Sequence, residues 1–252
     1  MSAKVGVQVA GTTPPGKIAP VAREAARLGY AELWLAEDFF DLGGMSSVAV
    51  ALGATERIPV GLGIASVRVR HPALTAMEFA TIAGAHPGRF MAGLGHGVTG
   101  WMEQMGLRPA SPIRSLREGT VAVRRLLDGE ELTETGEYAS FDAVRLSRAP
   151  SEHIPIYHGV HGPRSLELAG EVADGTLLGW FSSPEYVTWA RERIDAGRAR
   201  AGRDDPHQLA ALCILSVSDE DPKAAKAELA GWASRELAGV SDSDWMLSLI
   251  HI

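Results

Sequence analysis

The sequence is poor in cysteine and lysine, and each shortage excludes a class of protein. A single cysteine, Cys213, rules out a disulfide within the chain and is typical of a reducing compartment. Because this thiol lies in the apolar run 209–217, we expect it in the core. None of the lysines follows a predicted barrel strand, which argues against a Schiff-base aldolase; they are Lys4, Lys17, Lys223 and Lys226.

Long apolar runs and basic tracts are also missing. No run approaches the roughly 20 apolar residues that span a bilayer, and no basic-then-apolar leader opens the chain. The formal net charge of −7 argues against nucleic-acid binding. We therefore expect a soluble, cytoplasmic protein with no membrane or nucleic-acid partner. Its 252 residues suffice for one α/β barrel or two small domains.

The stretch 59–97 has the pattern of a strand, a helix and a second strand. Apolar residues separated by glycines at 60–64 are typical of a buried parallel strand. Pro72 opens a helical pattern that ends before His86-Pro87-Gly88, and the strand 90–94 follows. Parallel α/β folds bind ligands at the carboxyl ends of their strands. Residues 65–71 and 95–100 are therefore candidates for a site.

The rest of the chain continues this alternation and predicts a parallel barrel. Residues 132–146 interrupt it with a predicted hairpin before the fifth strand. We expect Ser46-Ser47 to cap the helix that runs to about Thr55. Seven barrel strands are predicted, and the eighth is missing; the seven lie at 5–9, 32–36, 60–64, 90–94, 154–158, 176–179 and 209–217.

Two blocks of sequence resemble one known family. Arg70-His71-Pro72 is followed by GRFMAGLGHG at 88–97, and HGVHGPRSLELAGEVADGTLLGW occupies 158–180. Both blocks, in this order, resemble the luciferase-like superfamily of flavin- and deazaflavin-dependent oxidoreductases, and the similarity runs from about Val5 to about Pro222. The resemblance implies a TIM-type (β/α)8 barrel of the bacterial-luciferase-like type.

The resemblance also raises an expectation about the end of the chain. Family members continue through an eighth strand, so we expect a single barrel domain over 1–246 that is truncated before strand 8. The last residues, LSLIHI at 247–252, are what translation of a transposon adapter from a sequencing library would give. We therefore expect a non-native tail there, and a homodimer for the full-length protein.

The resemblance implies catalytic roles for Asp38, Ser66 and His71. Asp38 corresponds to an aspartate that contacts the polar edge of the cofactor ring, although Phe39 stands where deazaflavin enzymes often have histidine. The alternative is that Asp38 only ends a strand and binds loop amides. Ser66 would lie beside the ring. His71 would contact the cofactor or only cap the following helix, and Arg70 would pair with a carboxylate.

Three further segments are implied to bind the cofactor. Gly63-Ile64 corresponds to a non-prolyl cis peptide that presses on one face of the ring, and the alternative is an ordinary strand glycine. The turn Gly95-His96-Gly97 lets backbone approach a ligand closely, as it would at an ordinary barrel corner. A helix start offers free amides for a phosphate, or is a plain capped start; its residues are Gly159, Gly162, Pro163, Arg164 and Ser165.

Two other kinds of site find little support. His153, His158 and His161 lack an obvious set of carboxylate ligands, so no metal is expected. No Gly-x-Ser-x-Gly elbow is present, which argues against a hydrolase.

The resemblance predicts an oxidoreductase that transfers a hydride between coenzyme F-420 and a small organic substrate. The alternatives are an FMN-dependent monooxygenase and a non-catalytic flavin-binding protein. Coenzyme F-420 carries a long acidic tail, for which five arginines would form a cationic groove unless they pair with acids such as Glu103 and Glu118; the five are Arg68, Arg70, Arg108, Arg114 and Arg164.

Overall fold

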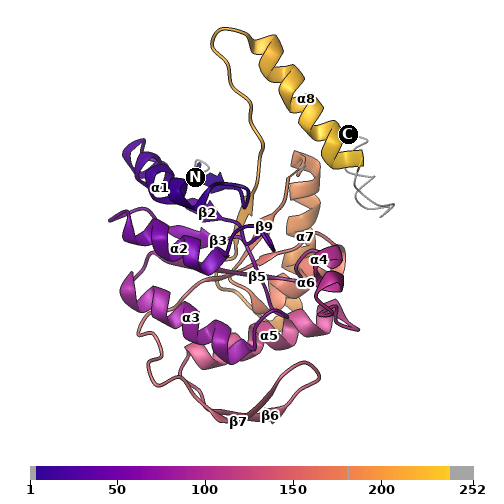
Figure 1. Ribbon diagram of the computed structural model, residues 1–252. Coiled ribbons are helices and arrows are strands. Elements are labelled where there is room, and N and C mark those ends of the chain that lie inside the picture. The colour runs from indigo at the N-terminus through magenta and orange to yellow at the C-terminus, as the bar shows by residue number, and fades with distance from the viewer. Residues whose placement is uncertain (1–3, 181, 239–252) are drawn as a thin grey trace.

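The computed structural model describes residues 4–180 and 182–238, which form a curved parallel sheet covered by helices (Figure 1). Seven strands pair in the order β1-β2-β3-β5-β8-β9-β10, and the short strand β4 also pairs with β5. The α/β fold and the seven predicted strands are confirmed. Their bounds are β1 Val7–Val9, β2 Leu33–Leu35, β3 Val60–Leu62, β4 Ala65–Ser66, β5 Phe90–Gly95, β8 Ile156–Gly159, β9 Gly175–Leu178 and β10 Gln208–Ala211.

The two faces of the sheet carry separate apolar clusters because successive side chains of a strand point to opposite faces. Leu33 and Leu35 pack in the large cluster beneath the helices, whereas Trp34 lies in a small cluster with Tyr157 on the other face. Gly61 makes room for this second cluster, since a Cβ there would lie 2.3 Å from the Trp34 ring. Burial on both faces explains the near-continuous apolar strand sequences.

The helices mostly alternate with the strands, as the sequence predicts. Prolines stand at the first helical position of α3, α5, α6 and α7, where the missing N–H costs nothing. The helices are α1 Ile18–Arg27, α2 Gly44–Gly53, α3 Pro72–Ala85, α4 Thr99–Gln104, α5 Pro112–Leu127, α6 Pro163–Val172, α7 Pro184–Ala201 and α8 Pro222–Ala238, with a 3-10 turn at Pro15–Lys17. In Figure 1, α8 stands at the end of an extended segment that leaves β10.

The predicted hairpin is confirmed as strands β6 (Leu132–Thr135) and β7 (Ser140–Val144), which pair antiparallel. Glu118 of α5 holds its tip, because its carboxylate accepts hydrogen bonds from three successive backbone N–H groups. The hairpin is thus fixed to the helix that precedes it.

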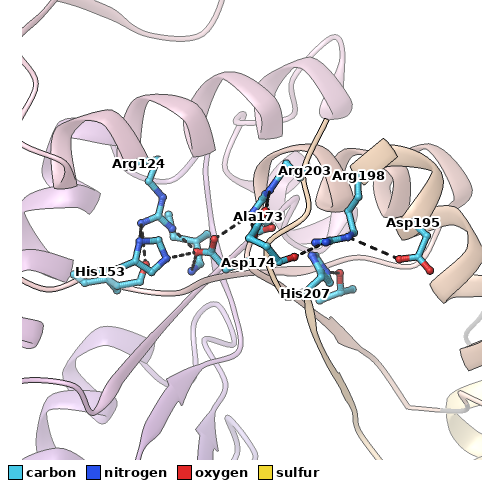
Figure 2. Close-up of polar contacts among 12 residues, drawn as sticks. Arg124, His153, Ala173, Asp174, Asp195, Arg198, Arg203 and His207 are labelled. Atoms are coloured by element: carbon cyan, nitrogen blue, oxygen red, sulfur yellow. Dashed lines mark hydrogen bonds and ion pairs between the residues drawn. The ribbon is translucent and has the colours of Figure 1, made fainter. Parts of the chain in front are cut away.

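Asp174 ties several elements together at the amino end of β9 (Figure 2). Its carboxylate accepts hydrogen bonds from the backbone N–H of Ile156 at 2.8 Å and from Arg203 at 3.3 Å. Arg124 of α5 and His153 also contact it. Because this network lies at the end of the sheet opposite the predicted site, we assign it to stability.

Two predictions about local structure are wrong. The run 209–217 is a strand only as far as Ala211, and Cys213 is exposed rather than in the core. Among the described residues β10 pairs with β9 alone, so nothing covers the later part of the run. The helix α2 begins at Gly44, before the predicted Ser46-Ser47 cap, and its N-cap is Gly43. A Cβ at Gly44 would lie 2.5 Å from Leu62 and 2.7 Å from Glu37.

The predicted tail at 247–252 lies outside the described residues and stays a prediction. Over residues 4–180 and 182–238, the structure contains no helix with the length and apolar character that crossing a membrane would need.

Candidate cofactor site

The predicted site residues lie at the carboxyl ends of β2, β3, β4, β5 and β8. Three of these ends are joined by direct contacts. The Ser66 hydroxyl donates to the carbonyl oxygen of His96 at 3.1 Å, and the His96 ring nitrogen Nε2 lies 3.0 Å from the Ser165 hydroxyl. Residues about 30 and 70 positions apart are therefore brought together.

The peptide bond between Gly63 and Ile64 is cis, as the resemblance implied. The Ile64 side chain fills the space beside two glycines of neighbouring strands. A Cβ would lie 2.6 Å from Ile64 at Gly95 and 2.7 Å from it at Gly159. The predicted glycines thus form a cradle around Ile64 that side chains at these positions would fill.

Ser66 is buried, with its hydroxyl already in use. It donates to His96 and accepts a hydrogen bond from the backbone N–H of Arg68 at 3.3 Å. Gly97 has a positive φ of 78°, and a Cβ there would lie 3.0 Å from the Ser66 side chain. The turn after β5 and the turn after β4 therefore fix one another.

Asp38 and Glu37 follow β2 and face different partners. Asp38 accepts a hydrogen bond from the backbone N–H of Gly11 at 3.0 Å, and partial burial raises the pKa of its carboxyl group. Glu37 is buried and pairs with both terminal nitrogens of Arg70, at 2.9 and 3.0 Å. The predicted pairing of Arg70 with a carboxylate is confirmed.

His71 has the geometry of the capping alternative. Its Nδ1 accepts a hydrogen bond from the backbone N–H of Ala73 at 3.2 Å, and Nε2 lies 3.2 Å from the Ser140 carbonyl oxygen. Its ring also packs against Phe141. Because both ring nitrogens have partners, we assign His71 to the start of α3 and to the hairpin.

The start of α6 is open. Gly162 is its N-cap, Pro163 follows, and no side chain among the described residues caps it. Arg164 is exposed and has no hydrogen-bond or ion-pair partner in the described part of the chain. Free amides, the positive end of the helix dipole and an unpaired guanidinium favour an anion here.

Burial keeps the nearby histidines neutral. Desolvation lowers the pKa of His96 and of His161, and lowers that of the fully buried His158 to about 3. His158 Nε2 is held 2.8 Å from the Thr120 hydroxyl. Within the described ranges no group of three His, Cys, Asp or Glu side chains could hold a metal ion.

Of the five arginines predicted to form a cationic groove, three pair with carboxylates, which is the alternative outcome. Arg70 pairs with Glu37, Arg108 with Glu103 and Arg114 with Glu137. Arg68 donates to the Tyr138 carbonyl oxygen at 3.1 Å. Among the described residues, Arg68 and Arg164 are the members of this group without a carboxylate partner. Glu103 was one of the acidic partners that the sequence offered, whereas Glu37 and Glu137 lie on distant segments and could not be assigned from the sequence.

An aromatic cluster beside Asp38 was not assigned from the sequence. The Phe39 ring lies 5.7 Å from that of Trp101 and 6.4 Å from that of Phe40, measured between centroids. Phe40 is 72% exposed. The only sequence signal was the position of these residues just after strand ends. The cluster forms an apolar wall at the same end of the sheet.

Comparison with known proteins identifies the class. The sequence pattern of the luciferase-like monooxygenases, a family of flavin- and F420-dependent oxidoreductases, matches residues 1–244. The chain belongs to this family.

Among its relatives is 5,10-methylenetetrahydromethanopterin reductase of Methanolobus tindarius, 32% identical over 223 residues, which make up 88% of this chain and 68% of the relative. A related solved structure is the coenzyme F420 dependent tetrahydromethanopterin reductase of Methanopyrus kandleri, with 26% identity and a TM-score of 0.78, covering 86% of this chain and 67% of that one.

A third structure shows the fold alone. The type II Baeyer-Villiger monooxygenase of Pseudomonas putida, in complex with FMN, is 18% identical, with a TM-score of 0.70 over 83% of this chain and 66% of that one. Of these two solved structures, the reductase depends on coenzyme F420 and the monooxygenase contains FMN.

Proposed function

We propose that this protein transfers a hydride between coenzyme F-420 and a small organic substrate. The open start of α6, with its free amides and unpaired Arg164, carries the proposal. It occurs in a chain 26% identical to a coenzyme F420 dependent reductase, whereas the FMN-containing structure is more distant.

The residues present fit such a cofactor. Gly162, Arg164 and Ser165 would bind its phosphate at the start of α6. Ile64, held between Gly95 and Gly159, would support one face of the ring. When bound, a deazaflavin supplies hydride chemistry and reacts poorly with oxygen.

Asp38 and the aromatic cluster complete the proposed site. Because burial raises its pKa, the Asp38 carboxyl group holds a proton more readily than an exposed aspartate, which suits a contact with the polar edge of the ring. Phe39 and Trp101 would exclude water from the substrate side.

One observation favours FMN instead. Three of the five predicted arginines pair with carboxylates, so the long acidic tail of coenzyme F-420 meets fewer free cations than the sequence implied. An FMN-dependent monooxygenase is therefore the second candidate, and a non-catalytic flavin-binding protein the third.

Titration of the complete protein with each oxidised cofactor, at rising salt, separates the candidates. We expect saturable binding of coenzyme F-420 that weakens with salt, and reduced F-420 should be consumed with a substrate but not with oxygen alone. Tight FMN binding with no F-420 binding would overturn the proposal. Binding without turnover of any reduced cofactor would support the non-catalytic alternative.

A further inference from the structure

A separate cavity of about 210 Å³ lies beside the predicted cofactor site. Its walls are the turn 67–72 that follows β4, the first half of α5, and the hairpin tip at 138–139. Three residues named in the sequence prediction of the cofactor site border it: His71, and two of the five groove arginines, Arg68 and Arg70.

Arg68 brings a positive charge without a counterion to this cavity. One terminal nitrogen donates to the Tyr138 carbonyl oxygen at 3.1 Å, and the guanidinium carbon lies 5.2 Å from the centre of the Tyr138 ring. Its Nε is buried without an acceptor, and no carboxylate of the described residues pairs with it. By contrast Arg70, on the same turn, is paired with Glu37.

Ser115 of α5 contributes a second unmet polar group. Its side chain is 2% exposed, and its hydroxyl has no hydrogen-bond partner among the described residues. Buried hydroxyl groups almost always find a partner, so this one calls for an explanation. The cavity therefore has two unmet polar side-chain groups in its walls.

The other polar groups of the walls are occupied. The Glu118 carboxylate accepts from the backbone N–H groups of Glu137, Tyr138 and Ala139, so its charge is engaged away from Arg68. Both nitrogens of His71 have partners. What remains is a positive charge and two groups able to donate, in a space that holds a few heavy atoms and some water.

We propose that this cavity binds a small oxyanion, a carboxylate or a phosphate group. Its oxygens accept hydrogen bonds from the Arg68 Nε–H and from the Ser115 hydroxyl, and its charge balances the guanidinium. The site is distinct from the phosphate position proposed at α6 and does not depend on which cofactor binds there.

Calorimetric titration of the full chain with inorganic phosphate, and separately with malonate, tests the proposal at ionic strength fixed with sodium chloride. We expect saturable binding of at least one, and the stronger of the two identifies phosphate or carboxylate as the preferred chemistry. Ser115→Ala should weaken it about tenfold, since one hydrogen bond to a charged group is lost. Arg68→Lys, which keeps the charge but loses the Nε–H, should also weaken it.

Two control variants test whether the measured anion binding takes place in this cavity. Ser47→Ala removes an equally buried hydroxyl that donates to the Gly43 carbonyl oxygen, and should leave anion binding unchanged. Arg164→Ala removes phosphate binding at the start of α6 and should leave unchanged the separate binding that Ser115→Ala weakens, because Arg164 does not line the cavity. Absence of saturable binding, or binding lost in Arg164→Ala and kept in Ser115→Ala, would overturn the proposal. If Arg68→Lys does not fold, Ser115→Ala alone decides, since it removes a single buried atom.

Discussion

At the residue scale, the site is held by side chains that connect neighbouring strand ends. Ser66, His96 and Ser165 form a continuous series of hydrogen bonds from the turn after β4, across the end of β5, to the start of α6. In the proposed phosphate site, the Ser165 hydroxyl already has His96 as a partner. The side chain that remains available to a phosphate is the Arg164 guanidinium. Its role is the easiest to isolate by mutation.

Replacing Arg164 by Ala should weaken cofactor binding by about 1.5–3 kcal/mol, the usual contribution of a hydrogen bond to a charged group. The fold should be unaffected, because Arg164 is exposed and has no partner among the described residues. Fluorescence titration with coenzyme F-420 measures the change. Arg191→Ala on α7, another exposed arginine, is the matched control. Equal affinity in the two variants would place the phosphate elsewhere.

Gly159 should not tolerate a side chain. An added Cβ would lie 2.7 Å from Ile64, so Gly159→Ala should lower the free energy of unfolding by about 1–3 kcal/mol through overpacking. Gly84→Ala is the control, because it stands in α3 with open space around it and should raise stability by about 0.5–1 kcal/mol. Urea denaturation compares the two. A neutral Gly159→Ala would mean that Ile64 can move.

At the element scale, buried histidines link the sheet to its surroundings. His158 of β8 contacts Thr120 of α5, and His207 contacts Thr176 of β9. Burial lowers the pKa of His158 to about 3 and that of His207 to about 4. The contacts of β8 with α5 and of β9 with His207 therefore require both histidine rings to be neutral.

Stability should fall as the pH drops below about 6.5. The unfolded chain then binds a proton at each histidine that the folded chain does not, and each contributes a loss of up to about 1.4 kcal/mol per pH unit down to its folded pKa. Urea denaturation from pH 7 to 4.5 measures this slope. His158→Gln, which removes the titrating group, should flatten it, whereas a slope unchanged in that variant would show that other groups dominate.

At the scale of the whole molecule, the two ends of the sheet have different roles: one carries the candidate site and the other a network that we assign to stability. The carboxyl ends carry the glycine cradle, Asp38 and the open helix start, while the amino ends carry the Asp174 network (Figure 2). The chain spans 68% of the length of the methylenetetrahydromethanopterin reductase from Methanolobus tindarius, so activity of the whole protein is a proposal.

Loss of the Asp174 charge should destabilise the whole domain. Asp174→Asn leaves Arg124 and Arg203 without their shared counterion, and we expect a loss of about 2–4 kcal/mol, near the lower range for broken buried pairs. Asp205→Asn removes the other, more exposed acidic partner of Arg203 and should cost less than about 1 kcal/mol. Chemical denaturation distinguishes them. Equal losses in the two variants would contradict the assigned role of the network.

Much of the fold could be predicted because its signals are local. Alternating strand and helix patterns located the seven strands, Pro163 marked the start of α6, and the pattern at 132–146 predicted the hairpin. The cis bond at Gly63-Ile64 was predicted only through the family resemblance. In each case neighbouring residues, or a motif read as a unit, carry the information.

The sequence by itself thus determined the strand and helix order, and with it the placement of the candidate site residues at the carboxyl ends of the strands. Tertiary structure alone decided that three of the five arginines pair with carboxylates, that His71 caps α3, that Cys213 is exposed, and that Arg68 and Ser115 border one cavity. Each of these depends on which distant segments meet, such as Arg68 with Tyr138, 70 residues later. The local sequence pattern does not predict such contacts between distant residues, because they depend on the packing of the whole sheet and its helices.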